Sequence, residues 1–480
     1  MSTENVPKLK LAALVALVVG SMIGSGIFAL PQNMAATSGA GSLIIAWIIT
    51  FFGMVMLAFA FLNLATRKPD ITGGVYGYAR AGFGDYVGFN SAWGYWLSAW
   101  TGNLAYIVAF FSALGMFEAL GFFGAGTTPY AVAGASVLVW TFHFLILRGI
   151  QGATLINTIT TVAKVVPILL FALIALVVFN LETFKLDFWG TPELGSIGDQ
   201  VKGCMLVTVW VFIGIEGASM FSSRAESMKS VGQATIIGFL LTIALLMAVS
   251  LLSFGILTQP ELAKLQNPSM AGVLEHAVGP WGAGLIKIAL LISVGGGLLA
   301  WTLLAAETPY LAAKDGVFPK IFSQLNKNGA PTAALWLTNG LVQLSLLWIL
   351  KSDAGYFSLI ALAASMILVP YVLSGLFALM VALRGEGYKN GKSTKDILIG
   401  LIASGYGVWL IYAAGLSYLL ASMLFYAPGL FFYWWAKREQ GQQPFKGYEA
   451  LLACLIVALG VYAVYLLITT GAIGNVILEG

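Results

Sequence analysis

A short stretch near the start of this sequence combines residue types that could bind a charged ligand. Residues 19–28 read VGSMIGSGIF, and Gly24, Ser25 and Gly26 are consecutive inside a long apolar run. Each glycine inside a helix costs about 1 kcal/mol relative to alanine, so the stretch favours a break in that helix. The half-helix after Gly24 would point free N–H groups and a positive dipole end at a carboxylate. The carbonyl of Ile23, on the other side of the break, would suit an ammonium group.

A second stretch, VWVFIGIEGASMF at residues 209–221, has a similar pattern and adds an acid. Gly214 and Gly217 flank Glu216, and unwound carbonyls at residues 210–213 would suit an ammonium group. Because placing a charge inside a membrane costs free energy, Glu216 is a candidate for proton or charge sensing. The alternative is that its carboxylate has a structural role and accepts hydrogen bonds from neighbouring hydroxyls. Glycines in membrane helices also permit close helix packing, which is the alternative interpretation of both stretches.

The composition places both stretches in a membrane. Of the 480 residues, 59% are hydrophobic and 9% are charged, whereas soluble proteins have about 25% charged residues. We therefore predict an all-α integral membrane protein. Two cysteines are too few for a disulfide scaffold. The first apolar run has no small-residue cleavage site, so we expect a mature helix there and not a signal peptide.

Apolar runs of about 20 residues indicate about 13 transmembrane helices. They are expected near residues 10–32, 41–66, 85–117, 130–148, 155–180, 202–222, 233–258, 280–312, 332–350, 355–383, 396–415, 417–436 and 449–470. The two glycine-rich stretches fall in the first and sixth helices. A separation of five helices is expected of two inverted repeats with discontinuous first members, here about 10–180 and 202–383. Together the two breaks would recognise the backbone of an α-amino acid.

The positions of Lys and Arg predict the orientation of the chain. Eighteen of these residues fall in one set of alternate loops, and four fall in the other set: Lys185, Lys202, Lys264 and Lys351. Since cytoplasmic loops carry the excess of positive charge, we expect a cytoplasmic N-terminus and, with an odd number of helices, a C-terminus outside. The net charge of +4 thus reflects topology and does not indicate a nucleic-acid partner.

Three further ionisable residues lie in apolar runs, and one of them, Lys287, is expected at the membrane interface. Lys164 could supply a fixed positive charge where sodium-coupled transporters of this architecture hold a cation, or its side chain could snorkel to the membrane surface. Glu307 could be functional or structural. Trp210 and Trp301 could stack on a cationic side chain, or they could serve packing alone. The two histidines have no ligand spacing, so no metal site or cofactor is expected.

Several motifs resemble those of one transporter family. They are GSMIGSGIFALP, ITGGVYGYARAGFG, YWLSAWTGN, WVFIGIEGASMFSSRAE, AWTLLAAETPYLAAKDGVFP and LVPY, within residues 9–440. This combination resembles the basic amino acid/polyamine antiporters of the amino acid-polyamine-organocation superfamily, and it is most similar to their arginine/ornithine branch. The resemblance implies a LeuT-type 5+5 inverted repeat, with a transporter core at 1–440 and a linker and extra helix at 441–480.

The resemblance also implies roles for the residues of the two breaks. Ser25 and Gly26 would bind the substrate carboxylate, and the carbonyls of Ile23, Trp210 and Ile213 would bind the α-ammonium group. This assignment agrees with the chemistry expected of the unwound backbone. The resemblance therefore makes both stretches parts of one substrate site.

Other matching positions would handle the substrate side chain and the gates. Trp301 would stack on the cationic side chain, and Asn103 would bind its polar end. Trp210 would act as a middle gate. An outer gate would consist of Tyr95, Glu216 and Tyr371.

This chain departs from the arginine/agmatine exchangers at two positions. Tyr106 stands where those proteins have methionine, and Glu307 stands where they have glutamine. Both departures fall where side-chain selectivity could be set. The added acid of Glu307 could favour a substrate with a terminal ammonium group, such as ornithine.

The function implied is exchange of basic amino acids, arginine for ornithine, by alternating access across a cell inner membrane. The partners would be these amino acids and the lipid bilayer, with a homodimer as a possible assembly. The alternatives are a proton-coupled amino acid permease, with Lys164 or Glu216 carrying the proton, and an exchanger of another amino acid for its decarboxylated amine. An enzyme would need a convergent acid–base or metal set, which the scattered ionisable residues do not form. A channel or a sensor is not excluded by the sequence.

Overall fold

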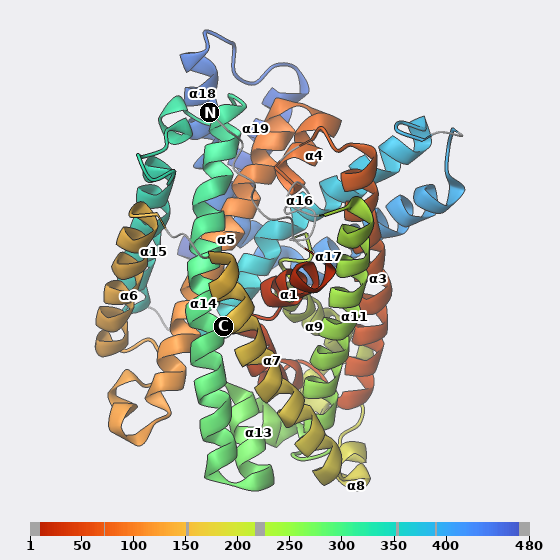
Figure 1. Ribbon diagram of the computed structural model, residues 1–480, viewed down its shortest axis with the longest axis vertical. Coiled ribbons are helices and arrows are strands. Elements are labelled where there is room, and N and C mark those ends of the chain that lie inside the picture. The colour runs from red at the N-terminus through yellow and green to blue at the C-terminus, as the bar shows by residue number, and fades with distance from the viewer. Residues whose placement is uncertain are drawn as a thin grey trace.

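A computed structural model describes residues 10–71, 73–149, 153–216, 226–351, 355–388 and 391–469. The α-helices are α1 (Leu11–Met22), α2 (Gly26–Ala35), α3 (Ala40–Arg67), α4 (Val75–Phe83), α5 (Asp85–Gly115), α6 (Pro129–Leu147), α7 (Ala153–Val178), α8 (Leu181–Lys185), α9 (Ile197–Phe212), α11 (Met228–Ser253), α12 (Gln259–Ala263), α13 (Ser269–Val278), α14 (Pro280–Lys314), α15 (Thr332–Ile349), α16 (Tyr356–Arg384), α17 (Thr394–Tyr426), α18 (Gly429–Glu439) and α19 (Tyr448–Thr469). Short 3-10 helices occur at Glu118–Phe123, Pro192–Leu194 and Lys320–Ser323. The described residues thus form a helical bundle, as predicted (Figure 1).

Within the described residues, ten helices are long and apolar enough to cross a membrane, or eleven if the bent pair α1 and α2 forms one span. The difference from the expected 13 has two sources. Of the sixth expected helix, the structure describes α9, which has 16 residues and is too short to cross a membrane by itself. The eleventh and twelfth expected helices are counted as one span, although Gly415, with the non-helical values φ 80° and ψ 159°, separates two helices within α17 at the predicted boundary.

The first transmembrane segment is broken where the glycines predicted. The axes of α1 and α2 differ by 44°, and residues 23–25 separate them. Ile23 is extended, with φ −80° and ψ 95°, so its carbonyl leaves the helical hydrogen-bond pattern. A discontinuous first helix is therefore confirmed.

The sixth segment also leaves helical geometry near its expected break. Helix α9 ends at Phe212, Ile213 has ψ 126°, and Gly214 takes the left-handed φ of 107° that favours glycine. Gly217 and the remainder of the expected sixth helix lie outside the described residues.

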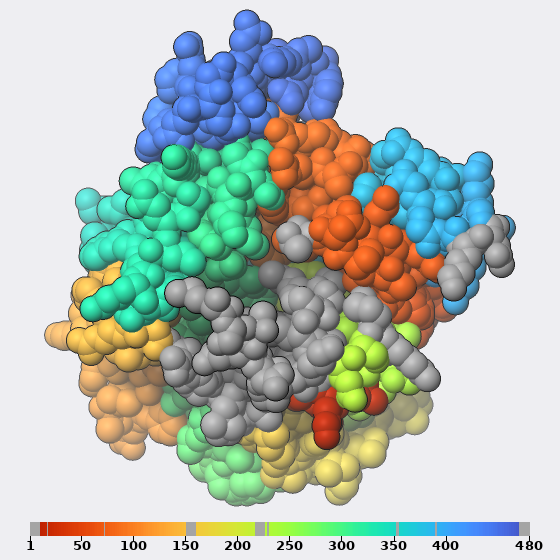
Figure 2. All heavy atoms as spheres, turned by 45° about the horizontal axis from the view of Figure 1, so that its top comes forward, coloured from red at the N-terminus to blue at the C-terminus, as the bar shows by residue number. Residues whose placement is uncertain are grey.

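Helix α5 lies at the centre of the bundle and α19 lies at its periphery. Helix α5 packs along both α14 and α16, and 89% of the residues in its most apolar stretch are buried. Helix α19 packs mainly on α17, and only 17% of the residues in its most apolar stretch are buried. The C-terminal helices, blue in Figure 2, protrude from the edge of the molecule. The low burial of α19 agrees with an appended helix that faces lipid.

The loops gather into the two sets expected from the count of Lys and Arg. In the Lys- and Arg-rich set, Asp85 pairs with Arg80 at 2.9 Å and with Lys437 at 2.7 Å, and Lys68 pairs with Glu386 at 2.5 Å. This pairing holds the pKa of the Glu386 carboxylate below its usual value.

Loops of the opposite set contact one another as well. The Gly41 N–H donates to Phe188 O at 2.6 Å, and the Asn180 N–H donates to Gly255 O at 2.8 Å. The two sets of loops therefore lie at opposite ends of the bundle.

Candidate functional site

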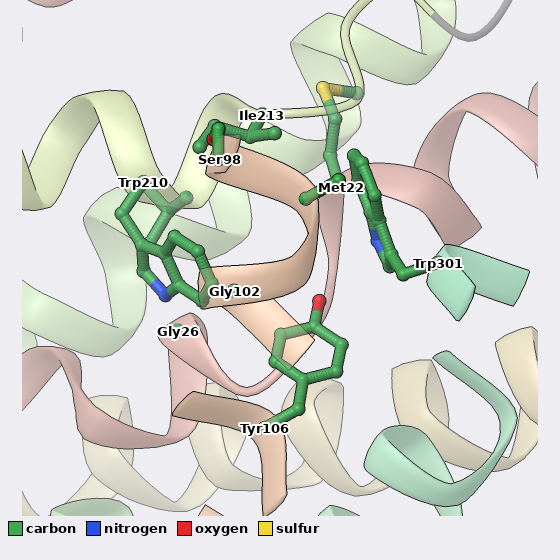
Figure 3. Close-up of a pocket in the computed structure, with 11 residues that line it drawn as sticks. Met22, Gly26, Ser98, Gly102, Tyr106, Trp210, Ile213 and Trp301 are labelled. Atoms are coloured by element: carbon green, nitrogen blue, oxygen red, sulfur yellow. The ribbon is translucent and has the colours of Figure 1, made fainter. Parts of the chain in front are cut away.

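A cavity of about 360 Å³ lies where the break between α1 and α2 meets the end of α9. It is lined by Met22, Gly24, Gly26, Ser98, Ala99, Gly102, Tyr106, Trp210, Val211, Ile213 and Trp301. Figure 3 shows Trp210, Tyr106 and Trp301 arranged around this space, which we call the central cavity. Four discontinuous or crossing elements, α1/α2, α5, α9 and α14, supply its wall. Five of the predicted substrate-binding residues line it: Gly26, Tyr106, Trp210, Ile213 and Trp301.

The glycines of the first break let aromatic rings approach the backbone. A Cβ added to Gly24 would lie 1.7 Å from the Tyr106 hydroxyl oxygen, and one added to Gly26 would lie 2.8 Å from Cδ1 of Trp210. The two rings meet edge to face, with centroids 5.9 Å apart. Gly24 and Gly26 are thus required for close packing as well as for the break, so the two interpretations of the glycines are compatible.

The start of α2 offers hydrogen-bond donors to an anion. Ser25 occupies the N-cap position, is fully buried, and makes no capping bond to the helix through its side chain. Its hydroxyl instead forms a 2.9 Å hydrogen bond with the Tyr356 hydroxyl. The first N–H groups of a helix lack intrahelical acceptors and carry its positive dipole end, which favours a carboxylate at this position.

The end of α1 is held by a buried lysine. The Lys164 ammonium group donates to Gly20 O at 2.7 Å and to Ile23 O at 2.5 Å, and the side chain is 2% exposed. The snorkelling alternative for Lys164 is therefore wrong. The Ile23 carbonyl, which was expected to receive the substrate ammonium, already accepts from Lys164, and a carbonyl has one more lone pair to offer.

Glu216 joins the two tyrosines that the resemblance grouped with it. The Tyr95 hydroxyl donates to Oε1 at 2.8 Å, the Tyr371 hydroxyl donates to Oε2 at 2.9 Å, and the Gly214 N–H donates to Oε2 at 3.2 Å. We call Tyr95, Glu216 and Tyr371 the Glu216 triad. All three side chains are buried, so the triad closes the space between α5, α9 and α16.

A second cavity of about 360 Å³ lies on the other side of the Glu216 triad from the central cavity. It is lined by Gly73, Val75, Tyr76, Tyr95, Glu216, Leu304, Glu307, Thr308 and Leu311. Gly73, Val75 and Tyr76 belong to the Lys- and Arg-rich end of the bundle, so we call this space the inner cavity. An outer gate at the Glu216 triad stays a prediction, and it conflicts with the predicted cytoplasmic orientation of the Lys- and Arg-rich end, because Tyr95 and Glu216 line the cavity on that side.

The comparisons with known proteins agree with this geometry. The amino acid permease family model matches residues 9–476. This chain belongs to the amino acid permease family. The permease is 54% identical over 475 residues to the arginine/ornithine antiporter of Pseudomonas aeruginosa, covering 97% of this chain and 98% of that one.

Two further relatives are somewhat less similar. A putative arginine/ornithine antiporter of Escherichia coli is 46% identical over 434 residues, or 90% of this permease and 92% of that protein. An arginine/agmatine antiporter of Chlamydia pneumoniae is 41% identical over 480 residues, or 98% and 99% of the two chains. The resemblance noted from the motifs is thus confirmed, and the chain is a multi-pass membrane transporter.

Asn103 and Glu307, which were expected to act on the substrate side chain, lie outside the central cavity. Asn103 is buried, and its Nδ2 faces Thr302 Oγ1 at 3.4 Å. It lines a smaller cavity of about 210 Å³ with Asn339, behind the wall formed by α5 and α14. Glu307 lines the inner cavity and not the space beside Trp301. Asn103 directly follows the cavity residue Gly102, and Glu307 lies six residues, or between one and two helical turns, beyond Trp301, so the helical rotation turns each side chain away.

Sequence reasoning missed several residues of the site. Met22, Ser98 and Gly102 line the central cavity, but an apolar or small residue in a packed membrane helix does not mark a site by its type alone. Tyr356 contacts Ser25 from a position 331 residues away in the chain. No spacing rule could have joined those two residues, because only the packing of α16 against the broken segment brings them together.

Proposed function

We propose that this permease is an inner-membrane antiporter that exchanges arginine for ornithine by alternating access. The observation that carries the proposal is the central cavity, which combines the donor-rich start of α2, unwound carbonyls and the ring of Trp301. These three features match the carboxylate, the ammonium group and the cationic side chain of a basic amino acid. The names of the relatives in Pseudomonas aeruginosa and Escherichia coli support the substrate pair.

The proposed backbone contacts follow from the two breaks. Ser25 and Gly26 bind the carboxylate, and the carbonyls of Ile23, Trp210 and Ile213 bind the α-ammonium group. Helix ends bind such groups in transporters with discontinuous helices, because the N–H and C=O groups there have no intrahelical partners.

The proposed side-chain contacts set selectivity. Trp301 stacks on the guanidinium or ammonium group, and Tyr106 limits the depth of the central cavity. Asn103 acts on the polar end of the side chain after a change of rotamer, because its Oδ1 has no hydrogen-bond partner among the described residues. Glu307 attracts the cationic side chain from the inner cavity.

The proposed gates lie on the two sides of the substrate. Trp210 covers the start of α2, where its ring lies against Gly26. The Glu216 triad closes the path to the inner cavity until its hydrogen bonds break. Lys164 supplies a fixed charge at the end of α1. Because arginine and ornithine carry equal charge, one-for-one exchange needs no coupling ion.

The topology completes the proposal. The Lys- and Arg-rich end faces the cytoplasm, so the N-terminus is cytoplasmic and the C-terminus lies outside. Residues 1–440 form the transporter core, and residues 441–480 add a linker and an extra helix. We further propose that the permease acts in transport and not in catalysis, and that it assembles as a homodimer in the bilayer.

Counterflow in proteoliposomes tests the function. Vesicles loaded with unlabelled ornithine should accumulate labelled arginine, and vesicles without internal substrate should not. Parallel vesicles loaded with lysine or agmatine rank the partners. Equal arginine uptake into loaded and unloaded vesicles would contradict obligate exchange.

A proton-coupled permease is the second candidate. The buried Lys164 ammonium at the break of α1 favours it, because its protonation would be linked to the geometry of the substrate site. This candidate predicts arginine uptake into unloaded vesicles when a pH gradient is imposed. Loss of that uptake in Lys164→Gln would support Lys164 as the proton carrier.

A further inference from the structure

The Ser25 hydroxyl is engaged by a residue to which neither the motifs nor the relatives assign a role. Tyr356 is the first residue of α16, and its hydroxyl lies 2.9 Å from Ser25 Oγ. Ser25 is fully buried and Tyr356 is 8% exposed, so water competes little for this hydrogen bond. The bond joins the broken segment to α16, a helix that packs along α5.

The position of this hydroxyl is the one proposed for a substrate carboxylate oxygen. Ser25 is the N-cap of α2, where a ligand anion would also meet the first N–H groups of that helix. A phenolic oxygen and a carboxylate oxygen are both acceptors for the Ser25 O–H group. The Tyr106 hydroxyl lies beside Gly24, the residue before Ser25, so a second phenol is close to this position.

Resting on the proposed function, we propose that Tyr356 competes with the substrate carboxylate for Ser25 and so sets the preference between amino acids and their decarboxylated amines. An amino acid must break the Tyr356–Ser25 hydrogen bond before its carboxylate can take the Ser25 hydroxyl. An amine without a carboxylate leaves that bond intact and binds through its cationic groups alone. Tyr356 is thus a specificity-determining residue that acts through Ser25.

The competition predicts opposite responses for the two ligand classes. Tyr356→Phe removes the competing oxygen and keeps the ring, so arginine and ornithine should bind about 3- to 10-fold more tightly. Agmatine and putrescine should change by less than about twofold. Ser25→Ala should weaken arginine and leave agmatine nearly unchanged, because only arginine uses the hydroxyl.

Equilibrium binding to the purified full-length permease tests this inference. The ligands are arginine, ornithine, agmatine and putrescine, measured by competition against labelled arginine and by calorimetry. Tyr426→Phe is the matched control, since Tyr426 is also buried and loses one hydrogen bond, its 3.0 Å bond to Met366 O. Thermal unfolding of each variant reports whether the fold is intact. In the Ser25→Ala background, Tyr356→Phe should have no further effect on arginine binding.

Equal changes for arginine and agmatine in Tyr356→Phe would overturn the inference, as would no change in either. If Tyr356→Phe is unstable, Ser25→Ala gives the same test from the other partner: equal weakening of both ligand classes contradicts the competition. Failure of the proposed function would appear elsewhere, as absence of arginine–ornithine counterflow in the wild-type permease.

Discussion

The central and inner cavities have equal volumes of about 360 Å³ but contrasting walls. Among the described residues, the central cavity is lined by aromatic rings and unwound backbone, and no acidic side chain belongs to its wall. The inner cavity carries two, Glu216 and Glu307. Under the proposed function, backbone groups bind the part of the substrate common to all amino acids, and the ring of Trp301 attracts the cation. The carboxylates at and beyond the Glu216 triad would attract the cation without holding it in the central cavity.

The largest expected effect concerns the geometry of the central cavity. In Gly24→Ala the new Cβ would meet the Tyr106 hydroxyl, and Tyr106 cannot move aside because its ring also lies against Gly297. Since displacements of about 1 Å at such sites cost about 100-fold, we expect at least that loss in counterflow rate. Gly284→Ala, on the same bundle but in open space, is the control and should retain activity. Partial recovery in Gly24→Ala/Tyr106→Ala would sharpen the assignment, and a fully active single variant would break it.

The next effect tests the aromatic wall. Trp301→Leu should weaken arginine and ornithine about 10-fold, because a cation–π contact contributes about 1–2 kcal/mol when desolvated. A neutral amino acid should lose less than about threefold. Trp281→Leu on the same helix is the control, since that ring is 57% exposed. Competition binding measures both classes, and equal losses would remove the cation–π role.

A smaller effect is expected where the two cavities meet. Glu216→Gln keeps the shape of the triad but loses two charge-assisted hydrogen bonds from Tyr95 and Tyr371. We expect the rate of exchange to fall about 5-fold while the affinity of the central cavity for arginine stays within about twofold. Paired counterflow and binding measurements check this separation. A large loss of affinity would mean that Glu216 contacts the substrate directly.

The smallest effect is expected from the second acid. Glu307→Gln should change equilibrium arginine affinity by less than about twofold, because Glu307 faces the inner cavity and not Trp301. Its effect should appear only in the concentration dependence of substrate supplied from the Lys- and Arg-rich side. Calorimetry on the purified variant and sided counterflow make this test. A 10-fold loss of equilibrium affinity would place Glu307 at the central site instead.

Much of the fold could be predicted because membrane segments follow local rules. Length and apolarity located the long helices, and the glycines around Gly24 and Gly214 marked the breaks, since backbone conformation there depends on the residues themselves. The helix count differs from the prediction through the way the segments are counted. Gly415 separates two helices within α17 where the apolar pattern predicted a boundary, because glycine adopts a φ of 80° at little cost.

The site was predicted more unevenly. The grouping of Tyr95, Glu216 and Tyr371 came from the family resemblance and proved to be one hydrogen-bonded unit. The depth of the triad could not be predicted, because it depends on how far the segment that continues from α9 extends through the bundle. Asn103 and Glu307 were placed near the substrate by the family resemblance, which does not show the direction in which each side chain points from its helix.

The sequence by itself determined the membrane setting, the position of the first break and the presence of donors and acceptors there, because composition and glycine conformation are local properties. Only the tertiary structure decided which side chains meet at that break. Lys164 reaches Ile23, and Tyr356 reaches Ser25, across 141 and 331 residues of chain. Such contacts depend on the packing of whole helices against one another, which no local pattern encodes.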